Sequence, residues 1–214
     1  MVLRRFLRAT CNVLQGVDAR QGPSACDGGL SKAALCALIH RGERLADDLV
    51  ACAGIQAWDP ADVEILPLLG SFAYLLRGTL DDRIDVTLDV RKGCPPCRTD
   101  ARALEAALQQ LAVNARDAMP DGGHLSLLAA PSRFADGSPA VAVVVLDSGC
   151  GMTAEVAERA MEPFFTTRSE SPLAGLGLAA VAGFARQSGG SLSLETWPGR
   201  GTCVTLQLPQ ANAL

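Results

Sequence analysis

The stretch DSGCGMTAEVAERAMEPFFTTRSESPLAGLGL, residues 147–178, decides the fold of this chain of 214 residues. It follows AVAVVVL (140–146), a continuous β-branched run that predicts a fully buried strand with Asp147 at its end. Gly149 and Gly151 allow a sharp turn and a close approach of a planar ligand to the main chain. A carboxylate beside them and Met152 can accept a hydrogen bond from an amino group such as that of adenine. A hairpin turn is the alternative.

The second half of the stretch adds features that favour phosphate. The segment Glu162–Arg168 ends in a cation, and Gly175, Leu176 and Gly177 then lead into a predicted helix. A helix N-terminus preceded by glycines presents free N–H groups and a positive dipole end to an anion. Together the two halves indicate a nucleotide.

Two further segments complete an ordered set of motifs. With Asn114–Asp117 upstream and Gly199–Thr202 downstream, the chain from about residue 60 to about residue 209 resembles the ATP-binding domain of sensor histidine kinases, within the GHKL superfamily of ATPases and kinases. The resemblance implies an α+β fold, an α/β sandwich with helices on one face of a mixed sheet. It also implies ATP and Mg²⁺ bound between the layers, under a mobile lid over the phosphates.

A predicted helix capped by Asp100 carries Gln110, Asn114 and Asp117 on one face, because they recur at spacings of four and three. The resemblance implies that Asn114 holds Mg²⁺ through its amide oxygen, and an unliganded polar face is the alternative. Gln110 stands where related ATP hydrolases carry a glutamate base, and glutamine cannot take a proton from water. This argues against a gyrase-like or chaperone-like ATPase. The nucleotide-binding residues that the resemblance implies are Asn114, Asp117, Asp147, Gly149, Gly151, Met152, Arg168, Gly175, Leu176, Gly177 and Thr202.

Residues 1–57 are expected to form a separate domain from residues 58–214. Apolar residues at spacings of three and four predict one amphipathic helix over 1–19 and a second from Ser31 to about Ile55, joined by the turn-rich segment 20–29. Such a hairpin buries too little alone and would pair into a dimeric four-helix bundle. The resemblance implies that this hairpin is the dimerisation and phosphoacceptor domain.

Two positions depart from the family pattern. Arg4-Arg5-Phe6 occupies the place of the acceptor histidine, and no histidine precedes His40. His40 has the chemistry of an acceptor but falls on the second helix, where a solvated neighbour is the alternative role. His124 follows a turn before a strand. In the lid, Pro172 and Leu173 replace glycine-rich sequence, which predicts fewer conformations and fewer phosphate contacts.

The composition is typical of an ordinary globular protein with an aliphatic core. The net charge of −4 argues against nucleic-acid or anionic-membrane binding, and no apolar run approaches the ~20 residues that span a bilayer, so a cytoplasmic location is expected. The cysteines are expected to be reduced. Cys94-Pro-Pro-Cys97 reads as a surface turn rather than a metal or redox site, because no second ligand pair lies nearby. A helix is expected over 63–78 and a strand over 84–90, with Trp58 between the two domains.

The sequence therefore predicts a histidine-kinase-like two-component protein that binds ATP and Mg²⁺, forms a homodimer and meets a response regulator. Three versions stay open: a relative that is degenerate for autophosphorylation at the usual site, an active kinase that uses His40 or a histidine on another chain, and a non-catalytic scaffold or phosphotransfer partner. A serine kinase or anti-sigma factor of the same superfamily is disfavoured by the predicted hairpin.

Overall fold

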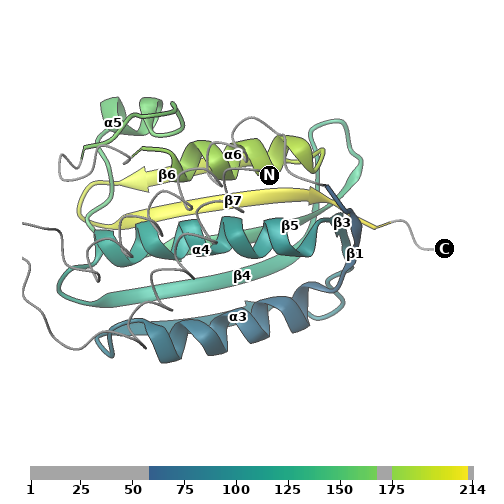
Figure 1. The fold of residues 1–214 in the computed structure, drawn as a ribbon, viewed down its shortest axis with the longest axis horizontal. Coiled ribbons are helices and arrows are strands. Elements are labelled where there is room, and N and C mark those ends of the chain that lie inside the picture. The colour runs from purple at the N-terminus through teal and green to yellow at the C-terminus, as the bar shows by residue number, and fades with distance from the viewer. Residues whose placement is uncertain (1–57, 168–174, 212–214) are drawn as a thin grey trace, which may run out of the picture. The chain divides into compact units, whose positions relative to one another are not determined.

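The computed structural model describes residues 58–167 and 175–211, and these form a two-layer α/β sandwich. Helices α3 (Ile65–Thr79), α4 (Ala101–Ala118) and α6 (Gly177–Gln187) lie side by side across one face of a sheet (Figure 1). This is the α+β architecture with helices on one face that the sequence predicted. The predicted N-terminal hairpin lies outside the described residues, and so do Arg4, Arg5, His40, Arg168 and the altered lid positions.

The main sheet has five strands and is mixed. Their order across the sheet is β2 (Ile84–Val90), β4 (Gly123–Arg133), β5 (Pro139–Asp147), β7 (Gly201–Pro209) and β6 (Ser191–Trp197). Strand β2 runs parallel to β4, and every other neighbouring pair is antiparallel. The register sets Asp147 opposite Leu125 on one side and Thr202 on the other, so the end of β5 lies within the sheet and not at its edge.

Strand β5 is covered on one face and not on both. Val141, Val143 and Val145 point toward the helices and are buried, whereas Ala142 and Val144 between them are only half-buried. The prediction of a strand was right, but the prediction of full burial was wrong. Small and β-branched apolar residues occupy both faces of β5. The alternation of buried and half-buried side chains therefore cannot be recognised from the sequence and follows from the packing.

The helices begin and end close to the predicted positions. Asp100 caps α4: its Oδ1 accepts hydrogen bonds from the amides of Arg102 (2.9 Å) and Ala103 (3.1 Å). Helix α3 begins at Ile65, which places Pro67 in the first turn, where its missing N–H has no intrahelical partner to lose. Val63, predicted as helical, instead ends a short strand.

That short strand, β1 (Ala61–Val63), pairs antiparallel with β3 (Cys97–Thr99) at the edge of the molecule. The expectation of a surface turn at Cys94–Cys97 was therefore wrong for its second half, because Cys97 lies in β3 with no exposed surface. Burial raises the pKa of the Cys97 thiol to about 12, which suppresses the thiolate that redox or metal chemistry needs. Both cysteines of the motif are free thiols.

The core fills the space between sheet and helices. Trp58 packs at its margin, with its ring 6.3 Å from that of Phe184 on α6 and tilted by 56°. The largest side chains that are almost fully buried are those of Ile65, Leu69, Leu104, Leu108, Leu125, Leu127, Val141, Val143, Leu176, Val181, Leu206 and Leu208. Trp58 thus anchors the start of the described sandwich, and the predicted contact with residues 1–57 falls outside the described residues.

Candidate functional site

Asp147 is the buried carboxylate around which the candidate site is built. Its side chain is only 8% exposed, and Oδ1 accepts hydrogen bonds from the amides of Gly149 (2.8 Å) and Thr202 (3.2 Å). Within the described ranges, no residue donates a hydrogen bond to Oδ2. Burial raises the pKa of the Asp147 carboxyl, and the two amides oppose that rise. The result is a carboxylate with one oxygen fixed and the other available as an acceptor.

The loop after Asp147 needs its glycines for close packing. A Cβ on Gly149 would lie 2.6 Å from the methyl group of Ala118, at the end of α4. Gly151 has a φ of +63°, and a Cβ there would run into the main-chain carbonyl of Trp197. The amide of Cys150 donates to the Ala118 carbonyl at 3.0 Å. This loop is therefore held between α4 and the end of β6.

The hairpin-turn alternative for this loop is wrong. After Gly151 the chain enters the short helix α5 (Ala154–Arg159), and it rejoins the sheet only at β6. Thr153 caps α5 by accepting a hydrogen bond from the amide of Val156 at 3.4 Å. The two strands that flank Asp147 in space, β4 and β7, are thus distant from this loop along the chain.

Thr196 is a site residue that sequence reasoning missed. Its hydroxyl Oγ1 accepts a hydrogen bond from the amide of Met152 at 2.9 Å and lies 3.0 Å from Oγ1 of Thr202. Thr202, which sequence reasoning included, contributes its amide to Asp147 as well. Because Thr196 is one of several hydroxyl residues on β6, nothing local distinguishes it, and only the register with β7 brings it to the loop.

The predicted polar face of α4 meets the first turn of α6. A Cβ on Gly177 would lie 3.0 Å from Oε1 of Gln110 and 3.8 Å from both amide atoms of Asn114. Helix α6 begins after Leu176 with no side-chain cap and no acidic residue in its first turn. Two amide side chains therefore face a helix N-terminus whose main-chain N–H groups have no capping side chain. Asp117 lies further along α4 and pairs with Arg116, with 2.7 Å between Oδ1 and Nη2.

The two segments that flank residues 168–174 are joined to each other. Phe164, with a φ of +67°, donates its amide to the carbonyl of Gly175 at 3.0 Å. Gly175 has a φ of +94°, and a Cβ there would lie 2.5 Å from the carbonyl of Phe165. A left-handed backbone is unfavourable for phenylalanine, so this junction is determined by its surroundings and not by its own preference.

His124, the histidine within the described residues, lies on the sheet. The Nδ1 of His124, in β4, is 3.4 Å from Oδ2 of Asp85, and both side chains are largely exposed. Across residues 58–167 and 175–211, no three His, Cys, Asp or Glu side chains gather as a metal site. Asn114 is not one of these groups, because its side chain is an amide. None of the helices in these ranges combines the length and the hydrophobicity of a membrane span.

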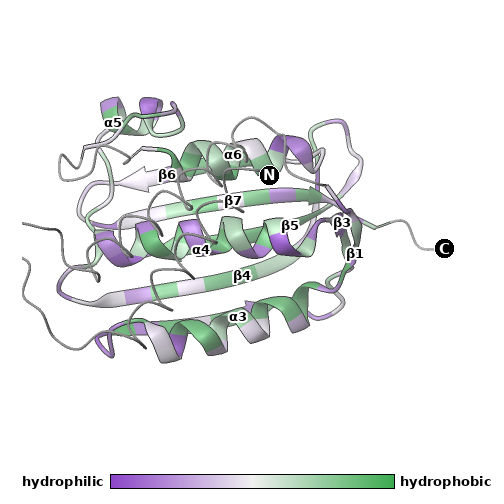
Figure 2. Ribbon diagram, viewed as in Figure 1, coloured by the Kyte–Doolittle hydropathy of each residue, from purple (hydrophilic) through white to green (hydrophobic). Residues whose placement is uncertain are grey.

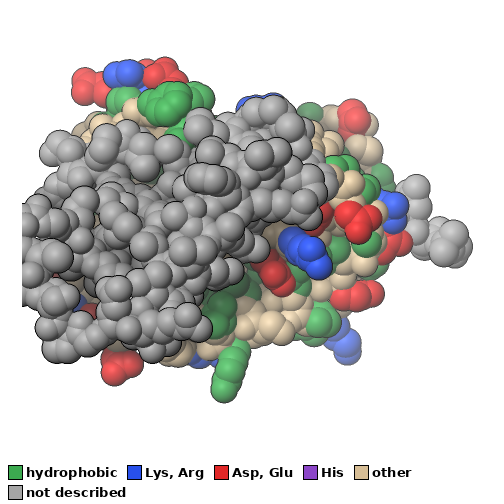
Figure 3. Space-filling view, viewed as in Figure 1, with side chains coloured by type: hydrophobic (Ala, Val, Ile, Leu, Met, Phe, Trp, Pro, Cys, Tyr) green, Lys and Arg blue, Asp and Glu red, His purple; other side chains and the backbone are tan. Residues whose placement is uncertain are grey.

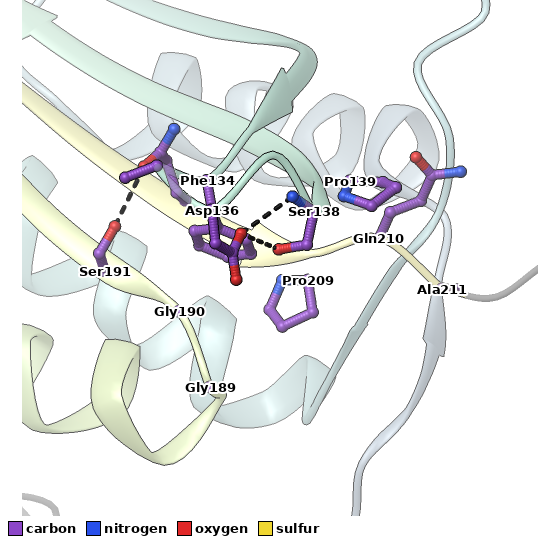
Figure 4. A pocket seen from close by; sticks show the side chains of 12 residues that line it. Phe134, Asp136, Ser138, Pro139, Gly189, Gly190, Ser191, Pro209, Gln210 and Ala211 are labelled. Carbon is purple, nitrogen blue, oxygen red and sulfur yellow. Dashed lines mark hydrogen bonds between the residues drawn. The ribbon is translucent and has the colours of Figure 1, made fainter.

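A surface hollow of about 790 Å³ lies at the other end of β5, where Pro139, Gly189, Pro209 and Gln210 form part of its wall. Figure 4 shows Asp136 among the residues that line it, with Oδ1 accepting hydrogen bonds from the amide (2.9 Å) and hydroxyl (2.6 Å) of Ser138. Eight residues of strand, at about 3.3 Å each, separate this end from Asp147. None of the predicted site residues lines this hollow.

Comparisons with known proteins agree with this arrangement. Residues 99–212 match the family model described as histidine kinase-, DNA gyrase B-, and HSP90-like ATPase. The sensor kinase CckA of Brucella abortus (strain 2308) is 33% identical over 181 residues, which is 80% of this chain and 19% of that protein. The sensor histidine kinase ZraS of Klebsiella oxytoca is 34% identical over 126 residues, which is 59% of this chain and 26% of that protein. The chain thus spans about a fifth to a quarter of these relatives.

Solved structures share the fold. Full-length ShkA, crystallised in complex with AMPPNP, matches with a TM-score of 0.74 at 24% identity, over 99% of this chain and 46% of that one. The Mycobacterial sensor histidine kinase MprB matches with a TM-score of 0.56 at 22% identity, over 72% of this chain and 98% of that one. With more than half of its length covered by the family model, this chain belongs to the histidine kinase-, DNA gyrase B-, and HSP90-like ATPase family.

Proposed function

We propose that residues 58–214 bind ATP together with Mg²⁺, and that the chain acts as a histidine-kinase-like protein of two-component signalling. The observation that carries the proposal is Asp147, a buried carboxylate with Oδ1 held by two amides and Oδ2 without a donor among the described residues. A buried acceptor of this kind is costly to the fold unless a ligand donates to it. The exocyclic amino group of adenine has the required chemistry.

The rest of the site suits a triphosphate. The first turn of α6 has uncapped N–H groups, which favour an anion, and Gly177 leaves room beside them. Asn114 would hold Mg²⁺ through its amide oxygen, which is compatible with an ion that keeps several water and phosphate ligands. The bound ion would supply charge neutralisation on the phosphates. Arg168 and Asp117 are proposed as further nucleotide contacts, with Gly149, Gly151, Met152, Gly175, Leu176 and Thr202 shaping the pocket.

The relatives support a kinase-like role rather than hydrolysis. CckA and ZraS are sensor kinases, and ShkA was crystallised with a nucleotide analogue. In this chain Gln110 lies beside Gly177, where a hydrolase would place a general base, and an amide has no basic site for the proton of an attacking water. ATP would therefore be bound without rapid hydrolysis.

The N-terminal part of the proposal rests on sequence. Residues 1–57 would form the dimerisation hairpin of a homodimer, and the chain would work with a response regulator. Because Arg4 and Arg5 stand in place of the acceptor histidine, we favour a degenerate protein that binds ATP without labelling itself at the usual position. An active kinase that phosphorylates His40 or a histidine on another chain is the second candidate, and a scaffold or phosphotransfer role is the third.

Nucleotide titration tests the central claim. Isothermal titration of the full chain with ATP and with ADP, in the presence of Mg²⁺, should show binding that Asp147→Asn weakens by roughly 1.5–3 kcal/mol, because a charge-assisted hydrogen bond is lost. Asp136→Asn is the matched control, since Asp136 is an exposed carboxylate at the opposite end of β5. Equal affinities in the wild type and Asp147→Asn would remove Asp147 from the site and with it the main support for the proposal.

A further inference from the structure

Helix α3 is apolar on its outward side as well as on the side that faces the sheet. Within Ile65–Thr79 the one charged residue is Arg77, whose Nε and Nη2 donate to the carbonyl of Val86 at 3.1 and 2.9 Å. On the outward side, Tyr74 is 80% exposed, Leu66 59% and Leu75 49%. Figure 2 shows α3 green over most of its length, and hydrophobic side chains project at its edge of the molecule in Figure 3. A helix that is apolar all round is normally covered on all sides.

Among the described residues, no contact or backbone conformation requires a glycine at Gly70 or Gly78 of α3. A Cβ added to Gly70 or to Gly78 would meet no atom within 4 Å, and neither residue has a positive φ. Each glycine lowers the stability of a helix relative to alanine. Gly70 and Gly78 therefore lower the helix propensity of α3 with no compensating contact among the described residues. Such positions are often shaped by function. Glycine allows another helix backbone to approach closely.

Large and small residues alternate along this side at a spacing of four. Leu66, Gly70, Tyr74 and Gly78 form one ridge of the helix. If a second copy of α3 lies antiparallel across a two-fold axis level with residue 72, Tyr74 of each copy meets Gly70 of the other. Leu66 then meets Gly78. The pattern is thus complementary to itself in the antiparallel direction, as a two-fold contact requires.

Charge also favours a second copy as the occupant. In a two-fold contact, every charged side chain near the axis approaches the same side chain of the second copy. This is unfavourable because the two have the same charge. The one charged residue of α3 is the exposed Arg77, which lies five residues from the level of the axis and whose guanidinium donates to the carbonyl of Val86 in its own sheet. A basic partner would find no complementary charge within Ile65–Thr79, and an acidic partner would find only Arg77 at one end.

We propose that the outward side of α3 is a self-association surface on which α3 of a second copy packs antiparallel. A single helix pair buries less than the roughly 1,200–2,000 Å² of a stable interface, so the contact is weak and reversible. It is separate from the proposed hairpin dimer of residues 1–57. If that dimer forms, the α3 contact joins dimers into larger assemblies; if it does not, the contact joins monomers into dimers.

Sedimentation equilibrium of the full chain, from low micromolar to several hundred micromolar, tests the proposal. The wild type should show a concentration-dependent step that Tyr74→Glu weakens at least tenfold, because each copy then brings a charge to the axis. Val113→Glu is the matched control: Val113 is an exposed apolar residue (41%) on the neighbouring helix α4 and lies off the ridge. It should leave the step unchanged.

Gly70→Ala gives a readout of opposite signs. It should raise the melting temperature of the chain, since alanine favours the helix and the added methyl group meets no atom. It should also weaken association, since the methyl group occupies the space for Tyr74 of the second copy. Three results would overturn the proposal: no concentration-dependent step, equal association of wild type and Tyr74→Glu, or a loss of folding in Tyr74→Glu, which would show that the chain itself covers this face.

Discussion

At the scale of single residues, Asp147 combines burial with an incomplete set of hydrogen bonds. Two amides hold one of its oxygens, and the carboxyl still has a raised pKa because desolvation outweighs them. The aspartate therefore makes the fold less stable at neutral pH than a neutral side chain of the same shape would. Such a cost is common at binding sites, where the ligand and not the fold benefits from the residue.

The raised pKa of Asp147 has a definite sign in pH experiments. The native state binds a proton more readily than the unfolded chain, whose value is near 3.8, so the contribution of Asp147 to stability falls as pH rises through the native pKa. At neutral pH, Asp147→Asn should be at least as resistant to thermal unfolding as the wild type. Differential scanning calorimetry of both proteins without nucleotide measures this, and a clearly lower melting temperature of the variant would contradict it.

The protonation of Asp147 should also appear in the pH dependence of ATP affinity. As pH falls toward the raised pKa of Asp147, protonation removes the carboxylate acceptor, so ATP affinity should begin to fall at a pH above the ordinary range of an aspartate. The titration of the ATP phosphates is a second source of pH dependence. Asp147→Asn separates the two, because it retains the phosphate effect and should lack the component that belongs to the carboxylate.

At the scale of elements, the candidate site depends on the residue at which each helix around it begins. The amide side chains of Gln110 and Asn114 reach Gly177 because the residue at which α4 begins sets the direction of every later side chain of the helix. Asp100 defines that start. Its Oδ1 caps α4, and its Oδ2 accepts a hydrogen bond from the amide of Asp59 at 3.1 Å, beside the anchored Trp58.

Removal of this cap should destabilise the sandwich measurably. Asp100→Ala leaves the first amides of α4 and the amide of Asp59 without their acceptor, which costs about 1–2 kcal/mol for the cap. For a domain of this size, that is a shift in melting temperature of about 2–4 °C per kcal/mol. Asp62→Ala is the control, because it removes only an exposed ion pair with Arg98 and should have a smaller effect. Equal shifts in the two variants would argue against the capping role.

At the scale of the whole molecule, two separate contacts between copies are expected, one from residues 1–57 and one from α3. The apolar stripe predicted between Ser31 and Ile55 includes Leu38 and Leu45, and a hairpin with this stripe needs a partner. Leu45→Glu should therefore convert the dimer expected at low concentration into a monomer in sedimentation experiments. Tyr74→Glu should leave that dimer intact, and a wild type that is monomeric at tens of micromolar would contradict the bundle.

The proposal that Arg4 and Arg5 stand in place of the acceptor histidine predicts the outcome of a gain-of-function experiment. Guanidinium is protonated at any workable pH and has no lone pair for in-line attack on a phosphate, so the wild type should not label itself at the usual position. With γ-labelled ATP, Arg4→His should gain acid-labile, base-stable label if the sandwich is competent, and Arg5→His serves as the register control. Label on the wild type that His40→Ala removes would instead make His40 the acceptor.

The sequence alone determined the fold class, the order of the motifs and the local signals of this protein. Interactions within a few residues explain the cap at Asp100, the position of Pro67 in a first turn and the spacing of Gln110 and Asn114. These features can therefore be predicted from the sequence. Gly149 and Gly151 could be singled out in the same way, because a tight loop leaves no choice of residue.

Only the tertiary structure decided which distant residues meet. The pairing of β5 with β7 brings the amide of Thr202 to Asp147, and the pairing of β6 with β7 brings the hydroxyl of Thr196 to Met152. No local pattern distinguishes Thr196 from the other hydroxyl residues of its strand. Likewise, the burial of Cys97, the strand at Val63 and the single covered face of β5 follow from neighbours far along the chain. Residue type and spacing encode local preference, whereas sheet register and burial are set by the packing of the whole domain.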